Sequence, residues 1–353
     1  MSRTRVLLTG ADSLIGSHIQ NILLSDRAIS LRAVITTSER ASEIQQEFTQ
    51  AGSSPDVVVL QGQLVAGSSA YDEPLRDDSD PFHIVLHTST GNPTHQVDCL
   101  ARFINLEAES LIDFLESIQE YAQRVRRVVI VNSLAPFAEW LVKEADASRL
   151  QSVAAVVDTE YILAASQAGN NIVHNTVLKW LTHFEPRFDV VFVTSPSCYG
   201  PATRPLETSS DVLDANRRIW NICNNEWDKV METTPFGIAP FADVRDVALA
   251  CVRIIHRMHV ANKHFMICGG VMPSDRRIAE FLHAQFPQSR GRLMHEQSSS
   301  HETQAEEFPM EMDSMTAVAM LGLPAYRSIQ ETLTDTTQQM LDLQHRKEWR
   351  RII

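Results

Sequence analysis

The chain has 353 residues, of which 44% are hydrophobic, so it can build a sizeable core in one large domain or two moderate ones. Its formal charge of −13 at pH 7 argues against nucleic acid and anionic membranes as partners. No apolar run approaches the ~20 residues that cross a bilayer, and no signal-peptide pattern precedes the first strand, which together indicate a cytoplasmic protein.

The chain opens on a predicted strand, a glycine turn and a helix. Residues 6–8 form a short apolar run, Thr9-Gly10 turns the chain, and residues 14–24 carry apolar side chains at helical spacing. Such a turn aims unpaired N–H groups and the positive end of a helix dipole at one point, which suits a pyrophosphate. An ordinary turn that binds nothing is the alternative. The residues expected to contact a nucleotide are Gly10, Ser13, Leu14, Ile15 and Gly16.

The second predicted strand, residues 31–36, ends without an acidic residue. In nucleotide-binding sheets an acid at this point binds a ribose hydroxyl, whereas a nearby arginine accommodates a 2′-phosphate. The strand ends in Thr36 and Thr37, which disfavours a strict NAD preference, and Arg40 is the nearest cation for a 2′-phosphate. A solvated arginine at a helix start is an equally good interpretation of Arg40.

Strands and helices alternate up to about residue 200. Further strands are predicted at residues 57–60, 84–87, 127–131 and 189–194, and helices at residues 97–121, 147–168 and 172–184. The last two helices are separated by Gly169-Asn170-Asn171, which we interpret as a break. This alternation predicts an α/β fold with a doubly wound parallel sheet.

Beyond residue 200 the pattern loosens. The sequence predicts helices at residues 211–224, 244–259, 274–286 and 328–343, and a strand at residues 264–268. The polar stretch 288–312 is predicted to be a mobile surface loop. We therefore divide the chain into a nucleotide-binding domain, residues 1–200, and a smaller, interleaved C-terminal substrate-binding subdomain, mainly residues 201–353.

Several short motifs are spread along nearly the whole chain. They are the T-G-x-x-x-x-x-G turn, V-L-H-T-S at residues 85–89, D-V-R-D-V-A at residues 243–248, L-G-L at residues 321–323 and E-T-L-T-D-T at residues 331–336. In this order they resemble the motifs of extended short-chain dehydrogenases, in particular the ketone and aldehyde reductases that include dihydroflavonol and cinnamoyl-CoA reductases. The resemblance implies a Rossmann-like fold, and NADP(H) is the cofactor that it and the second strand favour.

The resemblance also implies further residues around the cofactor. Ser13 takes the place of the family's middle glycine, and Gln63 that of its adenine-binding aspartate. The remaining residues expected at the cofactor are Leu64, Thr88, Ser89 and Pro196.

The family's catalytic pair is missing from this chain. Relatives protonate a carbonyl with the tyrosine of a Tyr-x-x-x-Lys pair, and a serine after the fifth strand orients the substrate oxygen. Ser133 matches that serine, but neither partner occurs at the expected positions, about 166–168 for the tyrosine and about 170–172 for the lysine. No tyrosine elsewhere in the chain has a lysine four residues later.

Other side chains can take over the missing chemistry. Tyr161 and His174 lie on the helical stretches around the gap, and with Ser133 they are our candidate catalytic residues. A packing aromatic and a partly exposed histidine are the alternative interpretations of the first two. His87, at the end of a buried strand, is predicted to be structural. The scattered cysteines and histidines predict no metal site.

Three functions remain open. The first is an enzyme that acts on a small biosynthetic intermediate by non-redox or unusual chemistry, such as isomerisation, dehydration or cyclisation. The second is an NADPH-dependent ketoreductase with a replaced proton donor. The third is a non-catalytic protein that binds a nucleotide or a partner, because fold alone does not define function. The sequence defines neither the substrate nor the oligomeric state.

Overall fold

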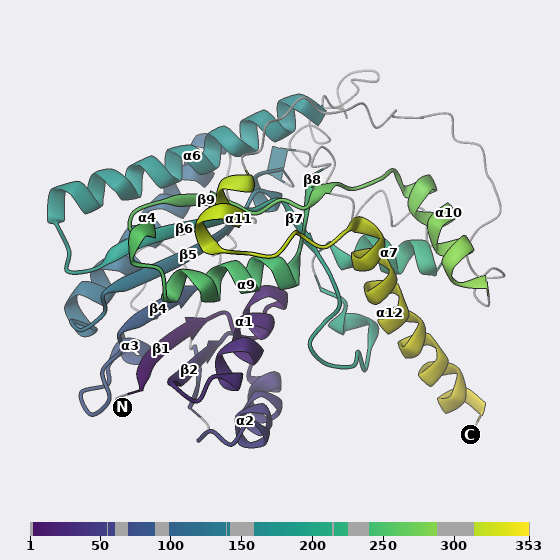
Figure 1. Cartoon of the computed structure of the whole chain (residues 1–353), viewed down its shortest axis with the longest axis horizontal. Helices are drawn as coiled ribbons and strands as arrows, with labels where there is room; N and C mark the ends of the chain where they lie inside the picture. The colour runs from purple at the N-terminus through teal and green to yellow at the C-terminus, as the bar shows by residue number, and fades with distance from the viewer. Residues whose placement is uncertain are drawn as a thin grey trace.

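The computed structural model shows an α/β fold built on one large sheet (Figure 1). The described residues are 3–54, 56–60, 70–88, 99–138, 140–141, 159–213, 215–224, 240–287 and 314–352. In this part of the chain seven parallel strands have the order β3-β2-β1-β4-β5-β6-β9, which confirms the predicted doubly wound sheet. The strands are β1 (Thr4–Thr9), β2 (Ile29–Ile35), β3 (Val57–Val59), β4 (Ile84–His87), β5 (Arg127–Ser133), β6 (Asp189–Ser195) and β9 (His264–Met266).

Helices cover both faces of the sheet, so its central strands are apolar along most of their length. One core lies between the sheet and α1 (Leu14–Ser25), α2 (Ala41–Gln50), α9 (Val244–Ile255) and α11 (Met315–Leu321). A second core lies on the other face under α3 (Asp72–Leu75), α4 (Leu100–Tyr121) and α6 (Thr159–Phe184).

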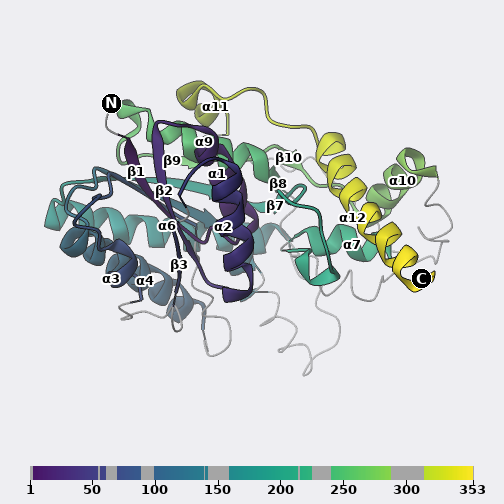
Figure 2. The ribbon, with the colours of Figure 1, turned by 90° about the horizontal axis from the view of Figure 1, so that it is seen from below.

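A smaller unit adjoins one end of the sheet (Figures 1 and 2). Its three-stranded sheet has the order β10-β8-β7, and its own core gathers side chains from three helices. The elements are β7 (Ser197–Tyr199), β8 (Pro240–Asp243), β10 (Gly270–Val271), α7 (Asn216–Cys223), α10 (Asp275–Gln285) and α12 (Ile329–Ile352). Short 3₁₀ turns complete the described chain at η1 (Ser38–Arg40), η2 (Ser209–Asp211) and η3 (Met258–Val260).

The predicted break in α6 is wrong, because one continuous helix runs through Gly169 and Asn170. A Cβ on Gly169 would lie 3.1 Å from the Phe137 ring, so this glycine serves close packing rather than a turn. The buried Asn170 side chain is held by hydrogen bonds to Asn132 and Thr194 of the sheet, so this residue anchors the helix instead of ending it.

The D-V-R-D motif joins the two parts of the chain. The buried Asp243 side chain caps α9 by accepting from the Arg245 backbone N–H, and it also accepts from the Thr332 hydroxyl of α12 at 2.7 Å. Burial alone would raise the pKa of Asp243, but the hydrogen bonds from Arg245 and Thr332 outweigh it and lower the pKa. Asp246 in turn pairs with Arg327, just before α12. The motif therefore ties the start of α12 to β8 and to the N-terminus of α9.

Two sequence-based expectations concern the chain as a whole. The boundary between residues 1–200 and 201–353 stays a prediction, and α9 and β9 of the second part do lie against the large sheet. Among the described residues, no helix combines the length and apolar character needed to span a bilayer. The proposed loop 288–312 lies outside the described residues.

Candidate functional site

The carboxyl ends of the parallel strands define the candidate site. The chain passes from β1 outward to β2 and β3 on one side, and then to β4, β5 and β6 on the other. The topological switch point therefore lies between β1 and β4, where ligands of open α/β sheets bind.

The glycine turn after β1 is tightly packed. Gly10 has a φ of +64°, which favours glycine. A Cβ on Gly16 would lie 2.0 Å from the Gly10 carbonyl oxygen, so only glycine lets α1 begin this close to β1. Leu14 and Ile15 begin the first turn of α1; Leu14 is buried, and the half-buried Ile15 packs against the core on this face of the sheet. The turn thus points the N-terminus of α1 at the switch point.

Ser13 suits its place in the turn. Its φ of −75° needs no glycine, and its Oγ accepts a hydrogen bond from the Gly16 N–H at 3.0 Å as the N-cap of α1. The side chain therefore takes one of the N–H groups that a phosphate would meet, and its own hydroxyl proton remains available as a donor.

An acidic side chain lies at the end of β2, although the strand itself carries none. Asp12 Oδ2 accepts from the backbone N–H groups of Thr36 and Thr37, both at 3.0 Å, and from their hydroxyls at 2.9 and 2.7 Å. Arg40 Nη1 donates to the Asp12 carbonyl oxygen at 2.7 Å. Sequence analysis missed Asp12 because the turn and the strand end are 24 residues apart and meet only through the β1–β2 pairing.

The end of β4 is closed by hydrogen bonds to β1. The Thr88 hydroxyl donates to the Thr9 carbonyl oxygen at 2.7 Å, and the Thr9 hydroxyl lies 2.9 Å from His87 Nδ1. His87 is buried and stacks on Phe114, and burial lowers its pKa to about 3. His87 is therefore neutral and structural, as the sequence suggests.

Ser133 lies at the end of β5, paired in register with Ser195 of β6. Its Oγ accepts from the Ala135 N–H at 3.1 Å and lies 3.4 Å from the Pro196 carbonyl oxygen. Pro196, expected at the cofactor, is itself buried beside this serine. Ser133 as a whole is half-buried at the end of the sheet where the strands finish.

Hydrogen bonds of Asn170 fix which turn of α6 lies beside the carboxyl ends of β5 and β6. Its Oδ1 accepts from Asn132 Nδ2 at 3.3 Å, and its Nδ2 donates to the Thr194 hydroxyl at 3.2 Å. Because Asn132 directly precedes Ser133, the exposed Ala168 lies near the level of Ser133. Ile172, one turn further along the same face, is 50% exposed. Ala168 and Ile172 fall within the ranges expected for the missing tyrosine and lysine, about 166–168 and 170–172, and this assignment stays a prediction.

Tyr161 lies farther out. It is 62% exposed, and it precedes Asn170 by nine residues, or about 13 Å of helix at 1.5 Å per residue. Tyr161 therefore lies beyond the strand ends, toward the N-terminus of α6, and its catalytic role stays a prediction.

The structure places His174 away from Ser133. Its ring contacts Phe192 and His264, at 4.2 and 4.9 Å between centroids. Phe192 precedes Ser195, the partner of Ser133, by three residues, which is about 10 Å along a strand. Burial lowers the pKa of His174, and burial together with His174 lowers that of His264 to about 4. Both imidazoles are therefore neutral at pH 7.

Sequence analysis also missed Glu107 on α4. The residues four positions to either side, Phe103 and Leu111, are both buried, so Glu107 lies on the inward face of the helix. Burial raises the pKa of its carboxyl group to about 7. The signal in the sequence is a glutamate within an apolar helical stripe.

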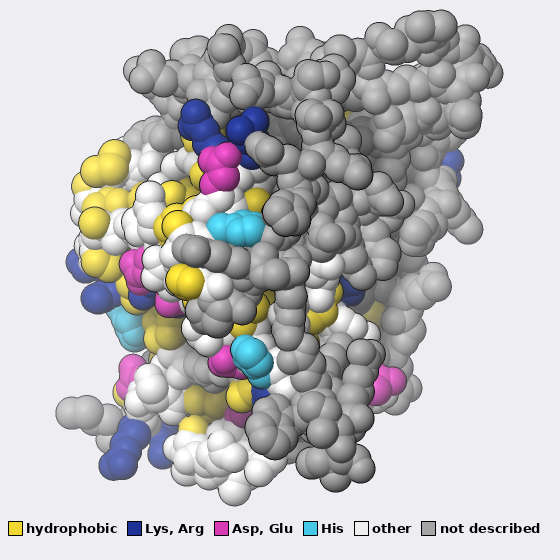
Figure 3. All heavy atoms as spheres, turned by 90° about the vertical axis from the view of Figure 1, so that its right-hand side faces the viewer, with side chains coloured by type: hydrophobic (Ala, Val, Ile, Leu, Met, Phe, Trp, Pro, Cys, Tyr) yellow, Lys and Arg dark blue, Asp and Glu magenta, His cyan; other side chains and the backbone are white. Residues whose placement is uncertain are grey.

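Three predicted site residues, Gln63, Leu64 and Ser89, lie outside the described residues. Within the described ranges no three His, Cys, Asp or Glu side chains gather as a metal site. Figure 3 shows charged and histidine side chains among apolar ones on the described part of the end formed by the smaller unit.

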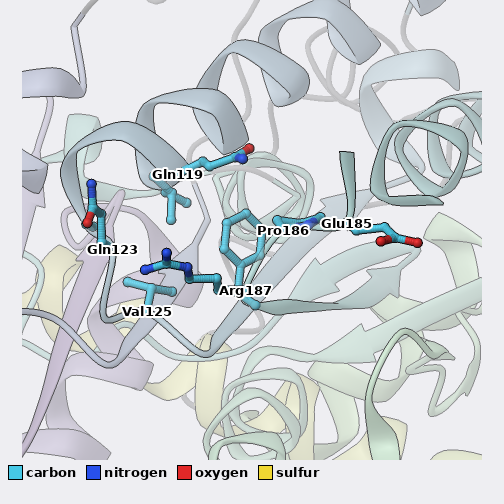
Figure 4. Close-up of a pocket in the computed structure, with 9 residues that line it drawn as sticks. Gln119, Gln123, Val125, Glu185, Pro186 and Arg187 are labelled. Carbon is cyan, nitrogen blue, oxygen red and sulfur yellow. The ribbon is translucent and has the colours of Figure 1, made fainter. Parts of the chain in front are cut away.

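A cavity of about 220 Å³ lies at the opposite edge of the large sheet, away from the candidate site (Figure 4). It is lined by the end of α4 and by the turn before β6, including Gln119, Gln123, Glu185 and Arg187. Because this edge carries the amino ends of β5 and β6, the cavity is no part of the nucleotide site.

No family model matches the chain. The chain is 26% identical to the ketoreductase azaE of Aspergillus niger over 82% of this chain and 84% of the relative. Among solved structures it is similar to the yeast methylglyoxal/isovaleraldehyde reductase Gre2 complexed with NADPH, with 18% identity, a TM-score of 0.69, and coverage of 97% of this chain and 100% of that one. Gre2 of Candida albicans in complex with NADPH gives a TM-score of 0.69 at 15% identity, covering 96% and 99%. The resemblance to extended short-chain dehydrogenases is thus confirmed, with the fold in common.

Proposed function

We propose that this chain, which has the fold of the extended short-chain dehydrogenases, is an NADP(H)-dependent reductase of small ketones or aldehydes. The observation that carries the proposal is the glycine turn at the switch point, where Gly16 is required by its contact with Gly10. The names of the relatives support it, because they include a ketoreductase and a reductase complexed with NADPH. This evidence favours the reductase hypothesis over non-redox chemistry, which the sequence analysis places first.

The residues present fit a nicotinamide dinucleotide. The N-terminus of α1 and the Ser13 hydroxyl offer donors to a pyrophosphate, and Arg40 lies at the end of β2 where the adenosine ribose is recognised. When bound, the cofactor supplies the hydride. Ser133 supplies a hydroxyl donor to the substrate oxygen, whose developing negative charge such a donor stabilises. The final proton comes from water, either directly or relayed from Tyr161, which lies beyond the strand ends.

NADPH oxidation by the purified chain tests the proposal, with methylglyoxal and isovaleraldehyde as the first carbonyl substrates. We expect oxidation only when a carbonyl compound is present. Ser133→Ala should lower kcat/KM about 10²-fold, as loss of one donor to a developing oxyanion does. Ser25→Ala, at the far end of α1, is the control and should leave the rate unchanged. Failure of NADPH to bind in a calorimetric titration would overturn the proposal.

Non-redox turnover is the second candidate, and one observation favours it. The exposed side chains of α6 near the level of Ser133 include Ala168, Asn171 and Ile172, none of which is an acid or base that donates a proton at neutral pH. Under this alternative the substrate is isomerised, dehydrated or cyclised with no net oxidation of NADPH. Product analysis by mass spectrometry distinguishes the two, since reduction adds two hydrogen atoms and isomerisation or cyclisation leaves the mass unchanged.

A further inference from the structure

The end of β2 holds a preformed set of anion-binding donors. Two backbone N–H groups and two hydroxyls, from Thr36 and Thr37, converge on a single point at 2.7–3.0 Å. Four converging donors are more than one carboxylate oxygen needs, since such an oxygen has two lone pairs. The arrangement is therefore one that suits a phosphate group, with its several acceptor oxygens.

An anion of the chain itself occupies this point. Asp12 Oδ2 accepts all four hydrogen bonds, and the residue is 8% exposed. Its other oxygen, Oδ1, accepts none of them, which leaves it for a ribose hydroxyl. The carboxylate thus supplies from the glycine turn the acidic group that dinucleotide-binding sheets carry at the end of β2.

A cation lies at the same place. Arg40 Nη1 donates to the carbonyl oxygen of Asp12, so the guanidinium group and the carboxylate share one corner of the candidate site. Arg40 Nε also lies 3.9 Å from a carboxylate oxygen of Glu43, at the limit of an ion pair. The Arg40 side chain is 27% exposed, so solvent and a ligand can reach it. The position that recognises the ribose therefore carries one charge that attracts a 2′-phosphate and one that repels it.

We propose that Asp12 sets the choice between the two nicotinamide nucleotides, by accepting the ribose hydroxyl of NADH and repelling the 2′-phosphate of NADPH. Arg40 acts in the opposite sense. The ratio of the Kd values for NADH and NADPH is therefore smaller than it would be if Arg40 were present without the Asp12 carboxylate. This inference rests on the proposed function, because it requires that a nicotinamide nucleotide binds.

Calorimetric titration of Asp12→Asn with NADPH and with NADH tests the inference. Asparagine keeps the shape and an acceptor oxygen but removes the charge, so we expect the Kd for NADPH to fall about tenfold. The Kd for NADH should stay constant or rise, because a carboxylate acceptor is lost. Asp26→Asn is the matched control: it removes the same charge at the far end of α1 and should change neither Kd. Arg40→Ala should raise the Kd for NADPH about tenfold and leave that for NADH unchanged.

The outcomes separate this inference from the proposed function. If neither nucleotide binds the wild-type chain or any variant, the proposed function fails. If both bind and Asp12→Asn shifts the two Kd values equally, the role of Asp12 is overturned while the proposed function stands. Should Asp12→Asn prove unfolded by circular dichroism, Asp12→Ser replaces it, because a serine hydroxyl can still accept from Thr36 and Thr37. The same change in the ratio of the two Kd values is then expected.

Discussion

The two halves of the candidate site differ in how tightly the fold constrains them. At the β1–α1 turn, Gly16 has no room for a Cβ and Asp12 holds the end of β2 through four hydrogen bonds. At the β5–α6 edge, Ala168 and Ile172 are exposed on a helix whose opposite face carries the packing. Residues of the first half are required by the fold itself, whereas those of the second half can change with little cost in stability.

The largest expected effect tests the first half. Gly16→Ala should destabilise the fold by about 3 kcal/mol or more, because its Cβ would lie 2.0 Å from a backbone oxygen that cannot move freely. Urea denaturation measures the loss. Gly52→Ala is the control, since a Cβ there meets nothing within 4 Å and only its φ of +70° costs about 1 kcal/mol. Equal stability of Gly16→Ala and wild type would contradict the packing argument.

The next effect tests the second half. The double variant Ala168→Tyr, Ile172→Lys restores the missing pair at the level of Ser133, and we expect kcat/KM for carbonyl reduction to rise about 10²-fold. The fold should tolerate it because both positions are exposed. The pair Ala164→Tyr, Ala168→Lys places the same side chains one turn away and is the control. If both variants raise the rate equally, the assignment of positions is wrong.

A smaller effect concerns the pH dependence of stability on the α4 and α6 face of the sheet. Burial raises the pKa of Glu107 to about 7 from 4.5, so between these values the folded chain binds more protons than the unfolded chain, and stability falls as pH rises. Glu107→Gln has no carboxyl group to ionise and therefore avoids this loss of stability at high pH. We expect the variant to be more stable than wild type by about 2 kcal/mol at pH 8, which is less than the full rise in pKa implies because Glu107 is only half-buried.

The difference between Glu107→Gln and wild type should shrink as the pH falls from 7 toward 4.5, and the pH-dependent part vanishes below 4.5, where the wild-type carboxyl group is protonated in both states. Urea denaturation at pH 8 and at pH 5 measures it. Glu109→Gln, two residues away on the exposed face of α4, is the control, and it should change the free energy of unfolding by the same small amount at pH 8 and at pH 5. A Glu107→Gln effect that does not depend on pH would contradict the burial argument.

Much of the scaffold could be predicted from the sequence, because its signals are local. Apolar runs between turn residues predict the strands of the large sheet, and β4 has the predicted bounds, Ile84–His87. The spacing of Gly10 and Gly16 likewise predicts the strand, turn and helix, because the close contact that requires Gly16 is with Gly10 in the same segment. Short or irregular elements such as β7 were missed, because three residues are too few for a periodic pattern.

The tertiary structure alone decided the contacts between distant segments. Gly169 and Asn170 are residues that often end helices, yet α6 continues through them. Gly169 leaves room for the Phe137 ring, and the Asn170 side chain donates a hydrogen bond to the Thr194 hydroxyl. Asp12 gives no sign of its role until the pairing of β1 with β2 brings it to Thr36. Local periodicity determines which segments are strands and helices, whereas the partners of a buried polar group depend on how those segments pair, and no single segment encodes that.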